Sequence, residues 1–212
     1  MKNAINEAVR QSLAGGAGDA EGKIRKLGKF CEEAGGSNVL FWARHDQNHL
    51  RCESEIERVF FAAMICHAGI LEGDSGPNES YGLTTGLPIE HWCYTHCRIY
   101  DDLDIQPDLN ECEMGLNYRP DFSFERAKSE GASCIGSLPL FIECDGHDFH
   151  EKTKEQVARD KKRDRKFVAA GLTIIRFSGS EIWANPLKCT WEVFALAEDR
   201  FQFAVKSFAK AG

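Results

Sequence analysis

Residues 138–145 read LPLFIECD, an apolar run that ends in two carboxylates. A short apolar run of this kind predicts a β-strand. Because strand side chains alternate between two faces, Phe141, Glu143 and Asp145 are expected to share one face. The other face then carries apolar residues that can pack in a core: Leu138, Leu140, Ile142 and Cys144.

A second strand is predicted at residues 117–124, NYRPDFSF, where Asp121 ends the short run YRPDF. Pro120 lacks a backbone donor, which favours an edge or a bulge there. Two carboxylates separated by one residue at the end of an apolar run are costly unless a positive group binds them. If the two strands pair with Asp121 near Glu143, three carboxylates converge on a hard cation such as Mg²⁺. The alternative for each acid alone is a solvated strand end.

Helices are predicted before and after this strand pair. Residues 54 to about 70 form an amphipathic helix, with Ser54 and Glu57 as a capping box. Residues 151–170 form a charged helix, which Thr153 and Gln156 can cap and Gly171 closes. Its inward-facing residues are expected to be Val157, Phe167 and Val168.

The remaining elements complete an α/β prediction. Residues 173–177, TIIRF, form a short strand, and an amphipathic helix runs from about 186 to 208. We therefore expect a central mixed β-sheet flanked by helices. Residues 1–52 are an N-terminal lead that is partly helical, and residues 53–208 are one domain with an inserted lobe at about 71–112.

Composition sets broad limits on the 212-residue chain. No apolar run approaches the ~20 residues that span a bilayer, and residues 1–18 lack the apolar core of a secretory signal, so we expect a cytoplasmic protein without a membrane partner. Nine cysteines, an odd number without a Cys-x-x-Cys pair, favour reduced and mostly buried thiols. The net charge is −7, yet residues 151–166 hold eight bases against four acids. An acidic protein can still present one basic stripe.

The string HWCYTHC at residues 91–97 offers soft metal ligands. A structural zinc site is one interpretation, although the spacing matches no standard zinc knuckle; buried or incidental thiols are the other. The candidate zinc ligands are His91, Cys93, His96, Cys97 and Cys112.

Arg119-Pro120-Asp121, followed by Glu143-Cys144-Asp145-Gly146, resembles the PD-(D/E)XK nuclease superfamily. The likeness is to the branch of very-short-patch-repair and related small restriction-like endonucleases, and it covers about residues 53–185 without 71–112. That branch has a helix glutamate, a strand aspartate, Glu-x-Asp-Gly, a histidine, a helix with Asp and Arg three apart, and a strand ending in Arg-Phe. The chain matches this order with Glu57, Asp121, Glu143, Asp145, Gly146, His150, Asp160, Arg163, Arg176 and Phe177.

The resemblance implies a restriction-endonuclease-like core and a metal-dependent endonuclease that hydrolyses DNA with Mg²⁺ or Mn²⁺. Asp121 and Glu143 would hold the ion, while Asp145 and Glu57 would bind a second ion or orient water. His150 would donate to a phosphate or shuttle a proton. The superfamily has a lysine two residues after the glutamate, where this chain has Asp145. The substitutes we expect for it come from the following helix: Lys152, Lys154 or Gln156.

The same helix offers residues for support and for DNA binding. Gln156, Asp160 and Arg163 lie along one face with Phe167, so Asp160 and Arg163 are either a buried ion pair that braces the site or a solvated pair. Other bases point elsewhere, where they contact DNA phosphates or form an ordinary solvated face: Lys161, Lys162, Arg165 and Lys166.

Two further classes of function remain open from the sequence. Without the usual lysine, the chain can be a catalytically inactive nuclease-fold module that binds DNA. It can instead be a zinc-stabilised interaction protein whose acids are structural. A homodimer is also open.

Overall fold

One mixed sheet forms the centre of the structure. The computed structural model describes residues 18–34, 51–73, 81–85, 99–107, 118–130, 133–146 and 153–211. Within these residues the sheet has six strands in the order β1-β2-β3-β5-β6, with β4 paired to β3 beside this path. Their bounds are β1 Tyr81–Thr85, β2 Ile99–Ile105, β3 Phe122–Glu130, β4 Ser133–Gly136, β5 Leu140–Asp145 and β6 Thr173–Ser178.

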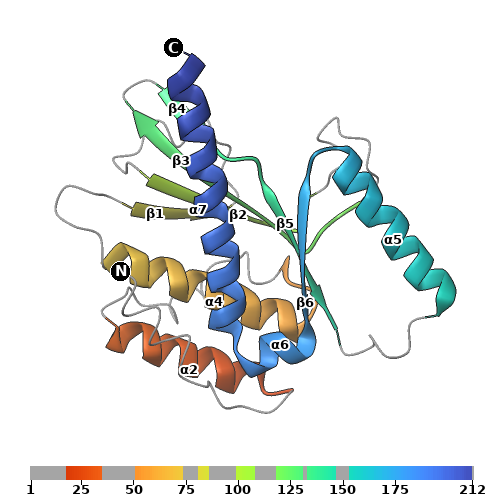
Figure 1. The fold of residues 1–212 in the computed structure, drawn as a ribbon. Helices are drawn as coiled ribbons and strands as arrows, with labels where there is room; N and C mark the ends of the chain where they lie inside the picture. Colours follow the sequence, from red (N-terminus) through yellow and green to blue (C-terminus); the bar gives the residue numbers. More distant parts are fainter. Residues whose placement is uncertain are drawn as a thin grey trace.

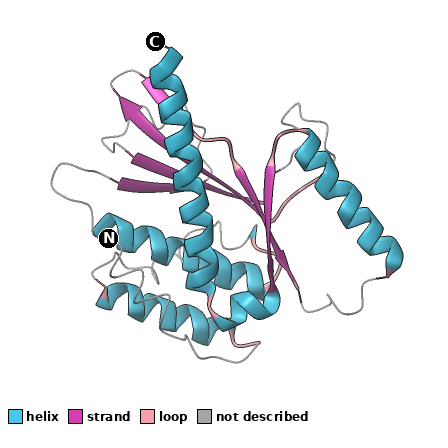
Figure 2. Ribbon diagram, in the orientation of Figure 1, coloured by secondary structure: helices cyan, strands magenta, loops and turns pink. Residues whose placement is uncertain are grey.

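Helices cover the sheet on both sides, as Figures 1 and 2 show, which confirms the predicted α/β class. Helices α4, α6 and α7 cover one face, α2 packs on α4, and α5 stands on the opposite side beside β6. Their bounds are α2 Ala20–Glu33, α4 Glu55–Gly73, α5 Lys154–Ala169, α6 Gly179–Ala184 and α7 Pro186–Ala211. None of these described helices is both long and apolar enough to cross a bilayer.

The strand pairing fixes which residues share a face. Strand β3 runs antiparallel to β2, β4 and β5, whereas β5 and β6 are parallel. Parallel neighbours need a crossover, and the chain between β5 and β6 contains α5. The antiparallel register places Phe122 opposite Ile142 and Phe124 opposite Leu140.

The larger core lies between the sheet and α4, α6 and α7. Phe122 and Phe124 of β3 point into it, together with Leu140 and Ile142 of β5. The ring of Phe60 on α4 lies 5.4 Å from that of Phe122, between ring centroids. The predicted inward positions Leu140, Ile142 and Cys144 are confirmed as buried, and Leu27 and Cys31 of α2 belong to the same core.

A small cluster on the opposite face holds α5. Phe167 packs against Phe141 and Tyr118 at ring-centroid distances of 5.5 and 5.6 Å. Phe167 therefore faces inward as predicted, but Val157 and Val168 do not: their side chains are 38% and 75% exposed. A helix turns about 100° per residue, so the narrow contact around Phe167 cannot also bury its neighbour Val168.

Several predicted boundaries are confirmed at α5 and shifted at the strands. Thr153 and Gln156 form the predicted capping box, and Gly171 ends the α5 segment with a φ of +70°. Strand β3 begins at Phe122, so the prediction that Asp121 ends a strand is wrong; Asp121 stands just before one. Leu138 was expected in the core but is 61% exposed, because β5 begins only at Leu140.

The described parts of residues 71–112 extend the central sheet. Strand β1 pairs parallel to β2, and β2 pairs antiparallel to β3. These strands were not predicted individually because the sequence there shows no clear alternation. The N-terminal lead contains one described helix, α2, as the expectation of a partly helical lead allows.

The small cluster around Phe167 makes a prediction about stability. Phe167→Ala should lower the free energy of unfolding by about 3–5 kcal/mol, because the substitution leaves a cavity under α5. Denaturant unfolding monitored by circular dichroism measures this change. Val168→Ala is the matched control, since this adjacent side chain is exposed and should change stability by less than about 0.5 kcal/mol. Equal losses in the two variants would show that Phe167 does not anchor α5.

Candidate active site

Three carboxylates gather where β5 ends and β3 begins, and we call Asp121, Glu143 and Asp145 the acidic site. Glu143 and Asp145 follow Phe141 at alternate positions, so they lie on the α5 side of the sheet, as predicted. Asp121 directly precedes Phe122, the residue of β3 that pairs with Ile142, and its carboxylate lies near enough to Glu143 for the charge of Glu143 to raise its pKa. The Cys144 backbone N–H donates to Asp121 Oδ2 at 2.6 Å.

Burial weakens Asp121 and Glu143 as acids. Asp121 has a pKa raised to about 7, chiefly by burial and then by the negative charges of Glu143, Glu57 and Asp145, against the opposing hydrogen bond from Cys144. Burial likewise raises the pKa of Glu143 to about 6, although Tyr118 and Arg176 favour its ionised form. Both groups therefore change protonation near neutral pH.

Arg176 on β6 supplies the positive charge. The parallel register places it opposite Glu143. Its Nη1 lies 3.3 Å from an Asp145 oxygen and 3.9 Å from a Glu143 oxygen. Its Nη2 lies 3.2 Å from Asp164 on α5. The nuclease resemblance includes Arg176 in its motif order, but Arg176 is not among the predicted site residues. The alternation in TIIRF, which puts Ile174 and Arg176 on one face, is the signal that could have identified it.

Tyr118 is a second site residue that the sequence did not reveal. Its hydroxyl donates to Glu143 Oε1, and both burial and the Glu143 carboxylate raise the pKa of this phenol. The guanidinium carbon of Arg163 lies 4.5 Å from the centre of the Tyr118 ring. Tyr118 lies in the irregular segment before β3, where no periodic pattern marks the direction of a side chain.

The predicted pair on α5 supports this arrangement from one side. Asp160 and Arg163 form an ion pair at 3.5 Å, with side chains 29% and 22% exposed. The pair is therefore partly buried, and Arg163 connects it to Tyr118. Gln156, the third predicted supporting residue, is exposed, and its side-chain oxygen accepts the Thr153 N–H at 2.7 Å in the capping box.

Glu57 fills its capping role and also lies near the acidic site. One oxygen accepts the Ser54 hydroxyl at 2.7 Å, and the other accepts the Glu53 N–H at 2.8 Å. Gln106 Nε2 lies 3.4 Å from that second oxygen, and the Gln106 N–H donates to the Asp121 carbonyl at 2.8 Å. Glu57 is buried, and its charge contributes to the raised pKa of Asp121. Gln106 therefore joins the α4 N-terminus to the start of β3.

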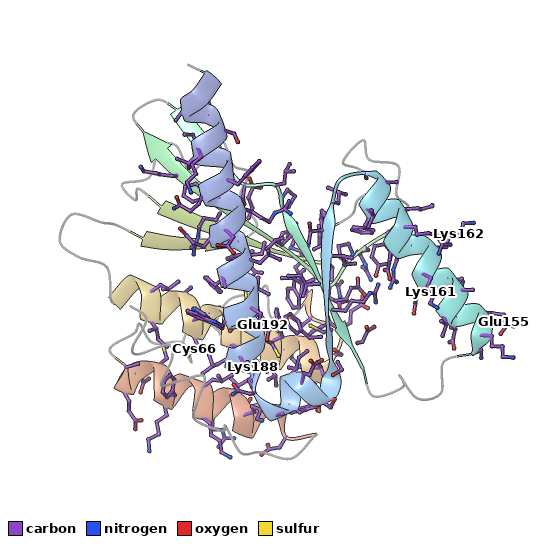
Figure 3. The ribbon with its side chains drawn as sticks, viewed as in Figure 1. Cys66, Glu155, Lys161, Lys162, Lys188 and Glu192 are labelled. Atoms are coloured by element: carbon purple, nitrogen blue, oxygen red, sulfur yellow. The ribbon has the colours of Figure 1, made fainter. Side chains whose placement is uncertain are left out.

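The remaining predicted residues divide into exposed and undescribed ones. Lys154 is exposed at the start of α5, and so are the four proposed DNA-binding residues Lys161, Lys162, Arg165 and Lys166. Figure 3 shows Lys161 and Lys162 on the side of α5 turned away from the sheet. The residues outside the described parts are His150, Lys152 and the candidate zinc ligands His91, Cys93, His96, Cys97 and Cys112.

The acidic site has the ligand chemistry of a hard-cation site without its finished geometry. Carboxylate oxygens are the donors that Mg²⁺ and Mn²⁺ prefer. Among the described residues, however, no three His, Cys, Asp or Glu side chains stand in an arrangement ready to hold an ion. Arg176 and Tyr118 instead occupy oxygens of Glu143 and Asp145.

Comparison with known proteins does not assign the chain to a family: no family model, curated protein or solved structure gives a significant match.

The raised pKa of Asp121 makes a prediction about stability and pH. Its pKa is about 7 in the folded chain against an ordinary value of about 4. Its contribution to stability is therefore complete below about pH 4 and is lost as the pH rises through about 7. Asp121→Asn keeps the acceptor for the Cys144 N–H and removes the charge. In EDTA at pH 8 the variant should melt above wild type, by about 2–4 °C for each kcal/mol gained.

The difference in melting temperature should disappear near pH 4, which thermal scans across this pH range will show. Asp199→Asn on α7 is the control, because it removes the same charge from an exposed position. If Asp121→Asn melts below wild type at pH 8, the folded chain stabilises the ionised Asp121 carboxylate, and the inference that its pKa is raised is wrong.

Proposed function

We propose that this chain is a metal-dependent endonuclease that hydrolyses phosphodiester bonds in DNA at the acidic site. The observation that carries the proposal is that two neighbouring carboxylates at the end of β5, the half-buried Asp121 and the buried Glu143, each have a raised pKa. Burying two such acids without a matching number of bases is unfavourable, and a bound divalent cation removes that cost. The restriction-endonuclease-like core is part of the same proposal, supported by the mixed sheet with helices on both faces.

In this proposal Asp121 and Glu143 hold Mg²⁺ or Mn²⁺, with the carbonyl oxygen of Cys144 as a further ligand. Such an ion would supply Lewis-acid chemistry for the scissile phosphate and for the attacking water. Asp145 and Glu57 orient the attacking water or contribute to a second ion. Asp121 and Glu143, whose pKa values are about 7 and about 6, would have to lose their protons to hold the ion.

Arg176 is the proposed substitute for the lysine that this sequence lacks. Its guanidinium lies 3.3 Å from Asp145, the residue at the lysine position, and its donors fit phosphate oxygens. Lys154, one of the three substitutes expected from the sequence, is exposed at the start of α5. The contacts of Arg176 with the carboxylates favour it over Lys154 for stabilising charge on a phosphate.

Helix α5 is the proposed DNA-binding element. Its sequence, KEQVARDKKRDRKFVA, contains seven bases and three acids, although the whole chain carries a net charge of −7. The helix is joined to the acidic site by the Asp164–Arg176 pair. A DNA backbone bound along the exposed side of α5 would thus be guided toward the acidic site by contacts with its phosphates, which carry no sequence information.

One observation favours a second function, the catalytically inactive DNA-binding module. Arg176 contacts Glu143, Asp145 and Asp164 at once, so it partly neutralises the acids without any ion. In the inactive module, these contacts of Arg176 would only hold α5 against the sheet. The two functions differ in whether cleavage depends on a divalent cation.

Glu143→Gln tests the proposed reaction. It should lower the rate of DNA cleavage by about 100-fold or more, because one charged oxygen donor is lost while the shape is kept. The assay uses supercoiled plasmid and single-stranded DNA with Mg²⁺, Mn²⁺ or EDTA. Glu192→Gln is the matched control: it lies exposed on α7, away from α5 in Figure 3, and should cut at the wild-type rate. Cleavage by Glu143→Gln at the wild-type rate would remove the residue from the mechanism.

A wild-type chain that cuts neither substrate under any of these conditions, yet binds DNA equally well in Mg²⁺ and EDTA, would establish the inactive module instead.

The lysines of α5 make a separate prediction about binding. Replacing both Lys161 and Lys162 with Met should weaken DNA binding and flatten its salt dependence, by about one unit of log–log slope per lost phosphate contact. The cleavage rate at saturating DNA should stay near that of wild type. Fluorescence anisotropy across a salt series measures the slope. Lys188→Met is the control, because Lys188 is exposed at the start of α7; an equal loss there would mean that α5 is not the binding surface.

A further inference from the structure

Two thiols meet where α2 packs on α4. The Sγ of Cys31 on α2 lies 3.6 Å from the Cys66 carbonyl oxygen on α4, and the Sγ of Cys66 lies 3.5 Å from the Leu27 carbonyl oxygen on α2. Each sulfur therefore points at the backbone of the other helix, which places both thiols in the contact between α2 and α4. Both are fully buried, and Figure 3 shows Cys66 on the side of α4 toward α2.

We propose that Cys31 and Cys66 are a redox modification site, which a hydroperoxide converts from two thiols into a disulfide that links α2 to α4. The pair differs from the other described cysteines, Cys52, Cys144 and Cys189, because burial raises the pKa of each of those thiols, whereas the pKa of Cys31 is lowered. It is also independent of the acidic site and of the proposed nuclease activity.

The two thiols have unequal roles. The interaction with Cys66 lowers the pKa of Cys31, whereas the interaction with Cys31 and burial raise the pKa of Cys66. The Cys31 thiolate attacks the hydroperoxide, the O–O bond breaks, and Cys31 becomes a sulfenic acid as water or an alcohol leaves. Cys66 then attacks the Cys31 sulfur, the S–O bond breaks, and water is released. Two thiols and one hydroperoxide thus give one disulfide, with the two electrons passed to the peroxide oxygens.

The disulfide would secure a helix that is attached at the edge of the fold. In the described structure α2 is held by its packing on α4 and by Lys23, whose buried Nζ donates to the Trp183 carbonyl at the end of α6. A covalent link from Cys31 to Cys66 closes the chain between them and restricts the unfolded state. The oxidised protein should therefore melt several degrees above the reduced protein.

The experiment treats the purified full chain with hydrogen peroxide, blocks remaining thiols with N-ethylmaleimide and digests with a protease that cuts after glutamate. Cleavage after Glu21, Glu32, Glu57 and Glu72 puts Cys31 in fragment 22–32 and Cys66 in fragment 58–72, each without another cysteine. Mass spectrometry should find these two fragments linked, at 2 Da below the sum of their reduced masses, an arithmetic loss of two hydrogens. Dithiothreitol should separate them.

Variants and stability complete the test. Cys66→Ser should lose the linked fragment and the peroxide-induced rise in melting temperature, whereas Cys189→Ser on α7 should keep both. If a variant folds poorly, the fragments of the wild-type protein still show whether Cys31 and Cys66 are linked. Recovery of fragments 22–32 and 58–72 unlinked from peroxide-treated, folded wild-type protein would overturn the proposal, whether their thiols are intact, over-oxidised or paired with other cysteines.

Discussion

Buried negative charge at the end of β5 is the constraint to which the rest of the site responds. The chain places Asp121 near Glu143 in a partly desolvated position and offsets the cost with three donors: the Cys144 N–H, the Tyr118 hydroxyl and the Arg176 guanidinium. The compensation is incomplete, because the pKa values of both acids remain raised. A site in this condition gains from any added positive charge, whether a proton or a cation.

The two faces of the sheet hold the acidic site in place through different kinds of contact. The large core under α4 and α7 fixes the β3–β5 register, and with it the position of Asp121 against Glu143. On the opposite face of the described structure, the Phe141–Phe167 cluster, the Arg176–Asp164 ion pair and the contact of Arg163 with the Tyr118 ring hold α5. Charges in the acidic site therefore contribute much of the attachment of the basic helix, which couples the position of α5 to the state of the acids.

Two sequence patterns gave predictions that the structure confirms: the alternation of strand residues and the capping boxes of the helices. The period of two in LPLFIECD correctly placed Glu143 with Phe141, and the capping boxes of α4 and α5 marked where those helices begin. Tyr118 and Asp121 precede β3 in an irregular segment, so no period predicts where their side chains point. Arg176 became visible as a site residue only with the β5–β6 register, which is a tertiary property. Val157 and Val168 show the limit of reading hydrophobicity alone, because a helix with a narrow contact leaves apolar residues outside.

Under the proposed function, Arg176 and a divalent cation compete for the same carboxylate oxygens. Arg176 now contacts Glu143 and Asp145, and an ion on Glu143 would weaken that attraction while leaving Asp164 as a partner on α5. A guanidinium freed in this way stands beside the acids with donors available for a phosphate. The present ion pairs and a catalytic role for Arg176 are then two states of one network.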